Sequence, residues 1–494
     1  MLRTFTVLIL AFFFVSCSFK PFYKEPKPSF NANLSLSECI NSKGAVCNNT
    51  GGLSEVKFEK EWWRIFNDQN LNSLVVKALK NNTDLKLSFL RFEQAAQNLG
   101  IERSALFPKL NASGNALRTH SNKNASALGV SSTTNNFNLG FNLSYEFDLW
   151  GKYKDSYLAA SRALKASVYD FEAARLSLIS TVIKLYFNSV HLNNQVQILE
   201  QTVEDYTASY ELKNEQFKVG AISEYELYSY KAQLESAKTQ LVSLRTSKDA
   251  NDKSLMILVS SDLNEILYAS TDQMEIESFK VELPQGISSE ILLQRPDIRA
   301  ALERLEQRNY LVGVARTAYL PNISLTGLLG FQSLELNNLG SSPTWNAGAS
   351  SLMPIFRWGE ITYNVNLAKL SKDEAYLNYE NVLKTVFAEV RTALIERESA
   401  FENEKNYADL LSSQEKIYKL AQIRYDNGSS SLTDLLDARR NYLNAKLSYE
   451  SSVYTLLSSV VDVIKAFGGG FNVKDEKSLN IKEQARDLDL SFRE

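Results

Sequence analysis

The chain has 494 residues, with 54 Lys and Arg against 57 Asp and Glu, and a formal net charge of −3. This balance argues against a nucleic-acid-binding protein, and no glycine-rich phosphate loop or basic–aromatic module occurs. Because its two histidines, His120 and His191, lie far apart without nearby cysteines, we expect no metal site, no cofactor and no catalytic constellation.

The N-terminus is typical of an export signal. Arg3 precedes the apolar run Val7–Val15, which is too short to span a membrane but fits the core of a signal peptide. The run leads into Val-Ser-Cys, the pattern of a bacterial lipobox, in which Cys17 becomes the lipid-modified first residue of the mature protein. Ser18, in place of Asp, suits sorting to the outer membrane. An ordinary signal peptide with a chance cysteine is the alternative. We therefore predict a signal peptide at 1–16 and a lipid-anchored leader at 17–54.

Two further cysteines lie in the turn-rich part of this leader. If Cys17 is acylated, Cys39 and Cys47 remain, an even number in an exported protein. A local disulfide and two reduced thiols are both compatible with the sequence.

Four segments alternate between apolar and polar residues. From Phe137 to Leu149 every odd position is apolar, which is typical of a strand with one dry and one wet face. Leu110–Ala116, Ile323–Phe331 and Trp345–Ile355 repeat the pattern more weakly. Strands of about ten residues can cross a bilayer when tilted, although a soluble β-sandwich is the alternative. Four strands leave two exposed edges and are too few to close a barrel, so several chains would have to pool their strands.

A long helical hairpin is predicted over residues 361–465. Apolar residues recur three or four apart in both arms, and each arm could reach roughly 55 to 100 Å. Gly428 and the serines that follow it supply the left-handed residue and the N-cap that a turn between helices needs. Taken alone, this pattern favours a structural coiled coil.

The chain contains this arrangement twice. Gly220 and Gly428 are separated by 428 − 220 = 208 residues, and Trp150 and Trp358 by 358 − 150 = 208. Landmarks in one order at one offset indicate an internal duplication. We predict a first repeat at 55–283 (strands about 108–149, hairpin about 152–247), a second at 284–471 (strands about 321–356, hairpin about 361–465) and a tail at 472–494.

The combined motifs resemble the outer-membrane factors of bacterial tripartite efflux pumps, the TolC/OprM-like lipoproteins. The matching stretches are Trp62-Trp63, Phe147–Gly151, Leu292–Ile298, Pro321–Gly327, Pro354–Gly359, Leu435–Arg439 and Ala466–Gly470. The resemblance implies a mainly α chain with a membrane β-barrel portion. In such a homotrimer, each chain gives four strands to one twelve-stranded barrel, and the hairpins form an α-helical periplasmic tunnel.

The same resemblance implies a function and partners. The chain would be a passive exit duct in the outer membrane, conducting drugs or toxic compounds through a gated periplasmic entrance. A periplasmic adaptor and an inner-membrane proton-driven (RND) transporter would be its partners, and it would not be an enzyme. A protein-export duct of a type I secretion system and a periplasmic coiled-coil adaptor or scaffold are the rival interpretations.

Site residues follow from the motifs that match the family. Asp434 and Asp437 match positions that ring the periplasmic entrance, and their spacing puts both on one helix face. Arg440 would pair with a neighbouring carboxylate, and Tyr425 and Glu226 match positions that hydrogen-bond between hairpins. Ordinary solvated charges at a helix tip are the alternative. The sequence departs from some relatives at one position, because Ser430 stands where they carry an arginine of the latch.

The turns themselves are the expected contact with the adaptor. The residues are Val219, Gly220, Ala221, Gly428, Ser429 and Leu432. The alternative is that the two glycines serve the turns alone.

Overall fold

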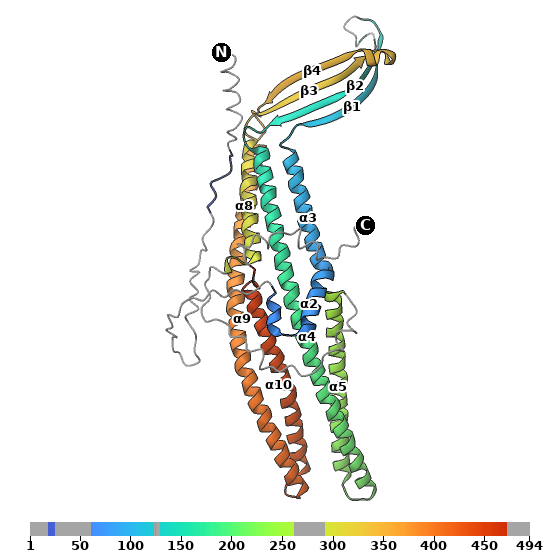
Figure 1. Ribbon diagram of the computed structural model, residues 1–494, viewed down its shortest axis with the longest axis vertical. Coiled ribbons are helices and arrows are strands. Elements are labelled where there is room, and N and C mark those ends of the chain that lie inside the picture. Colours follow the sequence, from blue (N-terminus) through green and yellow to red (C-terminus); the bar gives the residue numbers. More distant parts are fainter. Residues whose placement is uncertain (1–17, 25–60, 123, 125–128, 261–291, 472–494) are drawn as a thin grey trace. The chain divides into compact units, whose positions relative to one another are not determined.

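The computed structural model describes residues 18–24, 61–122, 124, 129–260 and 292–471. These residues form two compact units (Figure 1). The sheet unit comprises the described residues of 1–27, 92–167 and 300–380, and the hairpin unit those of 28–91, 168–299 and 381–494. No helix among the described residues is both long enough and apolar enough to cross a membrane.

The sheet unit contains four antiparallel strands in the order β1-β2-β3-β4 (Figure 1). Their bounds are β1 Lys109–Ser121, β2 Ser132–Phe147, β3 Asn322–Ser333 and β4 Pro343–Leu352, with a short 3-10 helix η4 (Leu336–Ser341) before β4. Sequence order and spatial order coincide, so β2 and β3 join the two halves of the chain and β1 and β4 are the edges.

The register gives this sheet an apolar face and a polar face. Phe141 of β2 lies opposite Ala112 of β1 and Leu329 of β3, while the next residue, Asn142, lies opposite Asn111. Directly opposed residues project from the same face, so the alternation in the sequence becomes an alternation of faces. Phe141 is 56% exposed in the single chain, so the apolar face of the sheet is not covered by other parts of the described chain. An exposed apolar face of this kind is typical of a surface that contacts a membrane or another protein.

The predicted fold class, mainly helical with four strands, is confirmed, although the strand ends differ from the prediction. β1 and β2 extend further toward their connecting loop, where His120 Nδ1 lies 2.8 Å from Thr133 Oγ1. The fourth strand ends earlier, at Leu352, because Pro354 has no N–H for a ladder hydrogen bond.

Two helical hairpins follow the two pairs of strands. The helices are η1 (Trp62–Phe66), α2 (Gln69–Asn81), α3 (Thr83–Ser104), α4 (Lys152–Lys218), α5 (Glu224–Val259), α8 (Pro296–Thr317), α9 (Glu360–Asp426) and α10 (Leu432–Ala466). α4 and α9 have 67 residues each, and their return helices α5 and α10 have 36 and 35. α5 continues past the predicted end of the hairpin because Leu255 and Val259 are fully buried.

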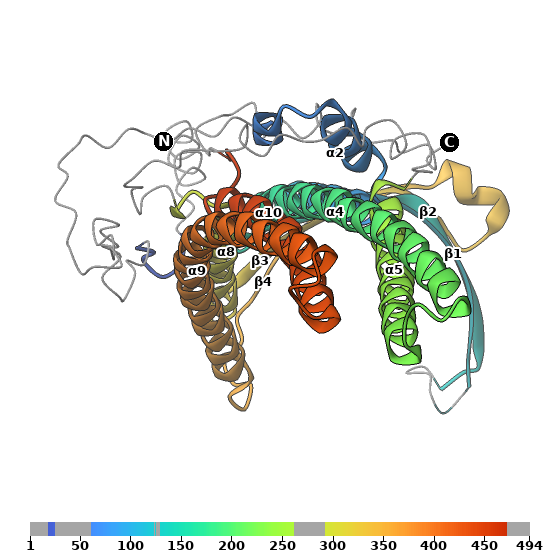
Figure 2. The same ribbon diagram turned by 90° about the horizontal axis from the view of Figure 1, so that it is seen from below.

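The core of the hairpin unit joins helices from both hairpins. Leu199 of α4, Leu241 of α5 and Leu443 of α10 belong to one buried cluster. Figures 1 and 2 both show α10 beside α4. Polar contacts reinforce this packing, since Gln195 of α4 donates to the Leu447 carbonyl of α10 at 3.1 Å. The two hairpins are therefore bonded directly to each other within one chain.

Arg295, in the motif before α8, connects three segments of the hairpin unit through hydrogen bonds and ion pairs. Arg295 is 8% exposed and donates to the Ala466 carbonyl near the end of α10 at 2.8 Å. It also pairs with Asp297 at 2.7 Å and Glu389 at 3.0 Å. A buried guanidinium with several partners is well satisfied, which accounts for Arg295 and Asp297 in this motif.

The closest backbone approach in the sheet predicts where it tolerates no side chain. A Cβ on Gly330 would lie 2.6 Å from the Cα of Gly140, its partner on β2, and would also overlap the Leu139 carbonyl. We expect Gly330→Ala to destabilise the sheet by about 1–3 kcal/mol and to lower the temperature at which the detergent-solubilised protein loses strand circular dichroism. Gly327→Ala on the same strand is the control, because its nearest neighbour would be 3.7 Å away. Equal melting of the two variants would contradict the close approach.

Candidate gate at the hairpin tips

Each hairpin turns on a glycine and restarts on a serine. Gly220 and Gly428 have φ angles of 74° and 69°, and a Cβ on either would meet no atom within 4 Å. Only the left-handed backbone therefore requires glycine at these positions. Ser223 accepts from the Glu226 N–H at 3.2 Å, and Ser431 accepts from the Asp434 N–H at 3.1 Å. These caps satisfy the first free donors of α5 and α10.

A charged cluster joins the two hairpins within about two helical turns of these tips. Lys213 Nζ of α4 donates to Glu226 Oε1 of α5 at 2.8 Å and to the Tyr425 hydroxyl of α9 at 3.3 Å. The Tyr425 hydroxyl donates to the same Glu226 oxygen at 2.8 Å. Lys213 also lies over the ring of Tyr230, 5.3 Å from its centroid. We call Lys213, Glu226 and Tyr425 the latch cluster.

The latch cluster is largely shielded from water, which strengthens its hydrogen bonds. The side chains of Lys213 and Glu226 are 14% and 19% exposed. Burial by itself would raise the pKa of Glu226, but the hydrogen bonds from Lys213 and Tyr425 outweigh it and hold the pKa below its ordinary value of 4.5. Burial and the hydrogen bond to Glu226 raise the pKa of Tyr425 to about 12. Glu226 is therefore ionised and Tyr425 remains a hydroxyl donor at neutral pH.

A second set of contacts joins the hairpins on the α10 side. The guanidinium of Arg439 lies 4.1 Å from the ring centroid of Tyr206 on α4, and its Nη1 donates to Ser209 at 3.4 Å. Gln233 of α5 donates to the Leu436 carbonyl at 3.2 Å. A guanidinium over an aromatic face is an attractive arrangement, so both helices of the second hairpin are held by the first.

The predicted gate carboxylates take part in local contacts on α10. Asp434 accepts from the Ser431 N–H at 3.2 Å and from the Ser430 hydroxyl at 3.0 Å, closing a capping box. Asp437 pairs with Arg440 at 2.8 Å, one turn along the same helix. The hydrogen bonds from Ser431 and Ser430 lower the pKa of Asp434, which keeps it charged. Among the described contacts, neither carboxylate hydrogen-bonds to the latch cluster, whereas the Tyr425 hydroxyl donates to Glu226.

The remaining predicted residues divide between the turns and the undescribed parts of the chain. Val219 is 80% exposed, and Gly220, Ala221, Gly428 and Ser429 are exposed too, with Leu432 half-buried at the start of α10. Cys17, Cys39 and Cys47 lie outside the described residues. Within the described ranges, no group of His, Cys, Asp and Glu side chains could hold a metal ion.

Sequence reasoning missed two participants, Lys213 and Arg439. Lys213 lies 220 − 213 = 7 residues before the turn glycine and Glu226 lies 226 − 220 = 6 residues after it. Residues at matched distances from a hairpin tip face each other, so this spacing could have revealed Lys213. The contact of Arg439 with Tyr206 spans the two hairpins, and no local pattern in the sequence announces it.

Open-edged strands combined with paired long hairpins define the class of outer-membrane exit channels, and comparison with known proteins identifies the family. The profile of the "Outer membrane efflux protein" family matches residues 74–259 and 287–469. The solved CmeC outer membrane channel of Campylobacter jejuni is 46% identical, with a TM-score of 0.88 over 97% of this chain and 100% of that one. The solved open state of the MtrE channel of Neisseria gonorrhoeae is 29% identical, with a TM-score of 0.79 over 92% of this chain and 99% of that one. The probable efflux pump outer membrane protein TtgC of Pseudomonas putida is 28% identical over 94% of this chain and 95% of its own length.

The chain therefore belongs to the outer membrane efflux protein family. It is the outer-membrane channel of an efflux pump, as the sequence resemblance implied. These three relatives are channel or efflux proteins, and none of them is named as an enzyme.

The lowered pKa of Glu226 predicts how the latch cluster responds to acid. A depressed carboxyl pKa contributes stability that is full above the ordinary value and is lost only as the pH falls through the lower, folded value. We expect spin labels on Ala221 and Ser429 to give the same distance distribution at pH 5.5 and pH 7.5, both above the ordinary carboxyl range. Glu226→Gln should weaken the contact by about 1–3 kcal/mol and lengthen the distance at both pH values.

Glu215→Gln is the matched control for this measurement, because Glu215 is exposed and pairs with Lys218 on its own helix. A lengthened distance in the parent protein at pH 5.5, or an unchanged distance in Glu226→Gln, would contradict the role given to the latch cluster.

Proposed function

We propose that three copies of this chain form one tube through the outer membrane, with β1 of each copy pairing with β4 of the next. The proposal is supported by the two edge strands and by the exposed apolar face that carries Leu139 and Phe141. Twelve strands are enough to enclose a lumen and leave no free edge. The paired hairpins of the three copies then form a helical tunnel that reaches into the periplasm.

We propose further that the hairpin tips are the gate of this tunnel. The observation that carries the proposal is the latch cluster, in which Tyr425 of the second hairpin bonds to Lys213 and Glu226 of the first. While these bonds hold, the second hairpin stays against the first; when they break, it can swing outward. The description of the similar MtrE structure as an open state supports a channel with more than one state.

Asp434 and Asp437 act in this proposal as a charged ring at the closed entrance. Three copies place six carboxylates around one axis, and a narrow ring of carboxylates repels anions and admits cations. Arg440 pairs with Asp437 at 2.8 Å, one turn along the same helix, and so helps to orient this carboxylate.

The partners and cargo follow from the exposed turns and from the passive nature of a duct. The turn residues Val219 and Gly428 present an exposed surface that a periplasmic adaptor meets first. The adaptor delivers compounds from an inner-membrane proton-driven transporter, and the duct conducts them outward. Relatives are named for the efflux of toluene and of cations, which supports a duct whose cargo, here drugs and other toxic compounds, is selected upstream. Acylation of Cys17 anchors the leader to the outer membrane.

Neutralising the two carboxylates tests the gate. We expect Asp434→Asn with Asp437→Asn to raise single-channel conductance and weaken cation selectivity in planar bilayers, because six negative charges leave the constriction. Asparagine is chosen over alanine because its amide oxygen can still accept the capping hydrogen bonds of Ser431 and Ser430.

The control variant carries Glu204→Gln and Glu211→Gln, two exposed carboxylates on α4, and has the same net charge as the test variant. Its conductance and selectivity should match those of the parent. If the asparagine variant also matches the parent, Asp434 and Asp437 are not part of the gate.

A further inference from the structure

The four residues Ser18–Pro21, which we call the strap, are held at many points inside the sheet unit. Arg316 of α8 donates to the Phe19 carbonyl at 3.3 Å, and the Phe19 ring meets Trp150 edge-on at 6.2 Å between centroids. Lys20 Nζ donates to the Tyr310 hydroxyl at 3.0 Å. Each of these contacts reaches a residue more than a hundred positions away, so a specific surface receives the strap.

The strongest feature of this surface is a buried carboxylate under Ser18. Asp155, in the first turn of α4, has no exposed surface, and the Ser18 hydroxyl lies 2.9 Å from both of its oxygens. Among the described residues, Ser18 supplies the side-chain donor to this carboxylate. A buried charge without a hydrogen bond is costly, so Asp155 favours a hydroxyl at position 18. Burial raises the pKa of Asp155, as expected where water is excluded.

Gly313 of α8 leaves space for the backbone of the strap at Lys20. A Cβ on Gly313 of α8 would lie 2.5 Å from Asp155 Oδ2 and 2.9 Å from the backbone nitrogen of Lys20. Either the strap or the carboxylate would have to move. Asn309, one turn earlier on α8, is fully buried and donates to the Pro21 carbonyl at 3.1 Å. The helix therefore presents both a gap and a donor that fit the backbone of the strap.

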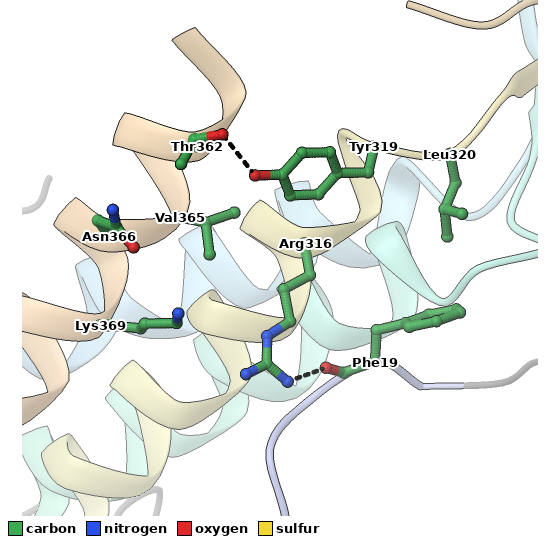
Figure 3. Close-up of a pocket in the computed structure, with 8 residues that line it drawn as sticks. All are labelled: Phe19, Arg316, Tyr319, Leu320, Thr362, Val365, Asn366 and Lys369. Atoms are coloured by element: carbon green, nitrogen blue, oxygen red, sulfur yellow. Dashed lines mark hydrogen bonds between the residues drawn. The ribbon is translucent and has the colours of Figure 1, made fainter. Parts of the chain in front are cut away.

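Phe19 also forms one wall of a pocket in the sheet unit. Figure 3 shows the Phe19 carbonyl at the Arg316 guanidinium, with the Phe19 ring turned away from it, and Val365 and Thr362 of α9 on the opposite side from Leu320. The pocket has a volume of about 410 Å³. The pocket is therefore lined partly by the strap and partly by residues of α8, α9 and the segment after α8.

We propose that this surface is a docking site for the chain's own N-terminal strap, in which Asp155 and Gly313 select a small hydroxyl residue at position 18. Ser18, the residue that follows the lipidated cysteine, would then matter twice: first for sorting to the outer membrane, and again for docking in the folded protein. Four extended residues span at most about 14 Å, so docking holds the anchored end of the chain close to α4 and α8. This consequence rests on the proposed acylation of Cys17, whereas the docking itself uses no acyl chain.

Photo-crosslinking tests the docking in the full-length protein in membranes. With p-benzoylphenylalanine in place of Phe19, we expect a crosslink to the tryptic peptide that contains Trp150. Ser18→Ala should reduce the yield strongly, because it removes the hydroxyl that lies against Asp155, while Ser18→Thr should retain most of it. Gly313→Ala should abolish the crosslink, and Gly100→Ala, on α3 where a Cβ meets no atom within 4 Å, should leave it unchanged.

Incorporation of labelled palmitate, measured on the same samples, separates the two proposals. A crosslink without palmitate would refute the anchor and leave the docking intact. Palmitate without a crosslink in the parent protein would refute the docking, as would equal yields in the parent, Ser18→Ala and Gly313→Ala.

Discussion

Two strand edges, those of β1 and β4, have no strand beside them in the described part of the chain, and this constrains how a channel can be built from it. Every residue of β4 except Thr344 is exposed in the single chain, and so is nearly all of β1. Free backbone groups cannot remain unpaired inside a lipid bilayer, and four strands cannot close on themselves. A channel built from this chain therefore needs other copies to complete it. The exposed apolar side chains that follow β4, such as Ile355 and Trp358, are further surface that a single chain leaves uncovered.

Matching positions in the two halves of the chain make different contacts, although the two halves have a similar order of elements. Trp150 donates to the Pro321 carbonyl at 2.7 Å and packs on Phe19, whereas Trp358, at the matching position, is 86% exposed. Around the tips, the first hairpin supplies Lys213 and Glu226, and the second supplies the single hydroxyl of Tyr425. The hairpins also meet through Arg439, which lies over the ring of Tyr206, and through Gln233, which donates to the Leu436 carbonyl, so both helices of the second hairpin contact the first.

Much of the fold could be predicted because its signals are local. The strict alternation from Phe137 gives the faces of β2, and the glycine turns give both hairpins. The ends of β1 and β2 were harder to predict, since Ser, Thr and His there carry no apolar alternation, although the strand pairing continues through them and the His120 and Thr133 side chains meet. At the candidate gate, Tyr425 and Glu226 came from family resemblance, while Arg439 and the strap's receptor Asp155 depend on contacts between distant segments. Ser18 and Asp155 are 137 positions apart, so no period or motif in the sequence connects them.

The sharing of one barrel by several chains is tested most directly by native mass spectrometry of the mature protein released from detergent micelles. We expect particles of three chains, and none of one chain, at concentrations where the protein is folded. A monodisperse, water-soluble particle of a single chain that does not bind detergent would contradict it.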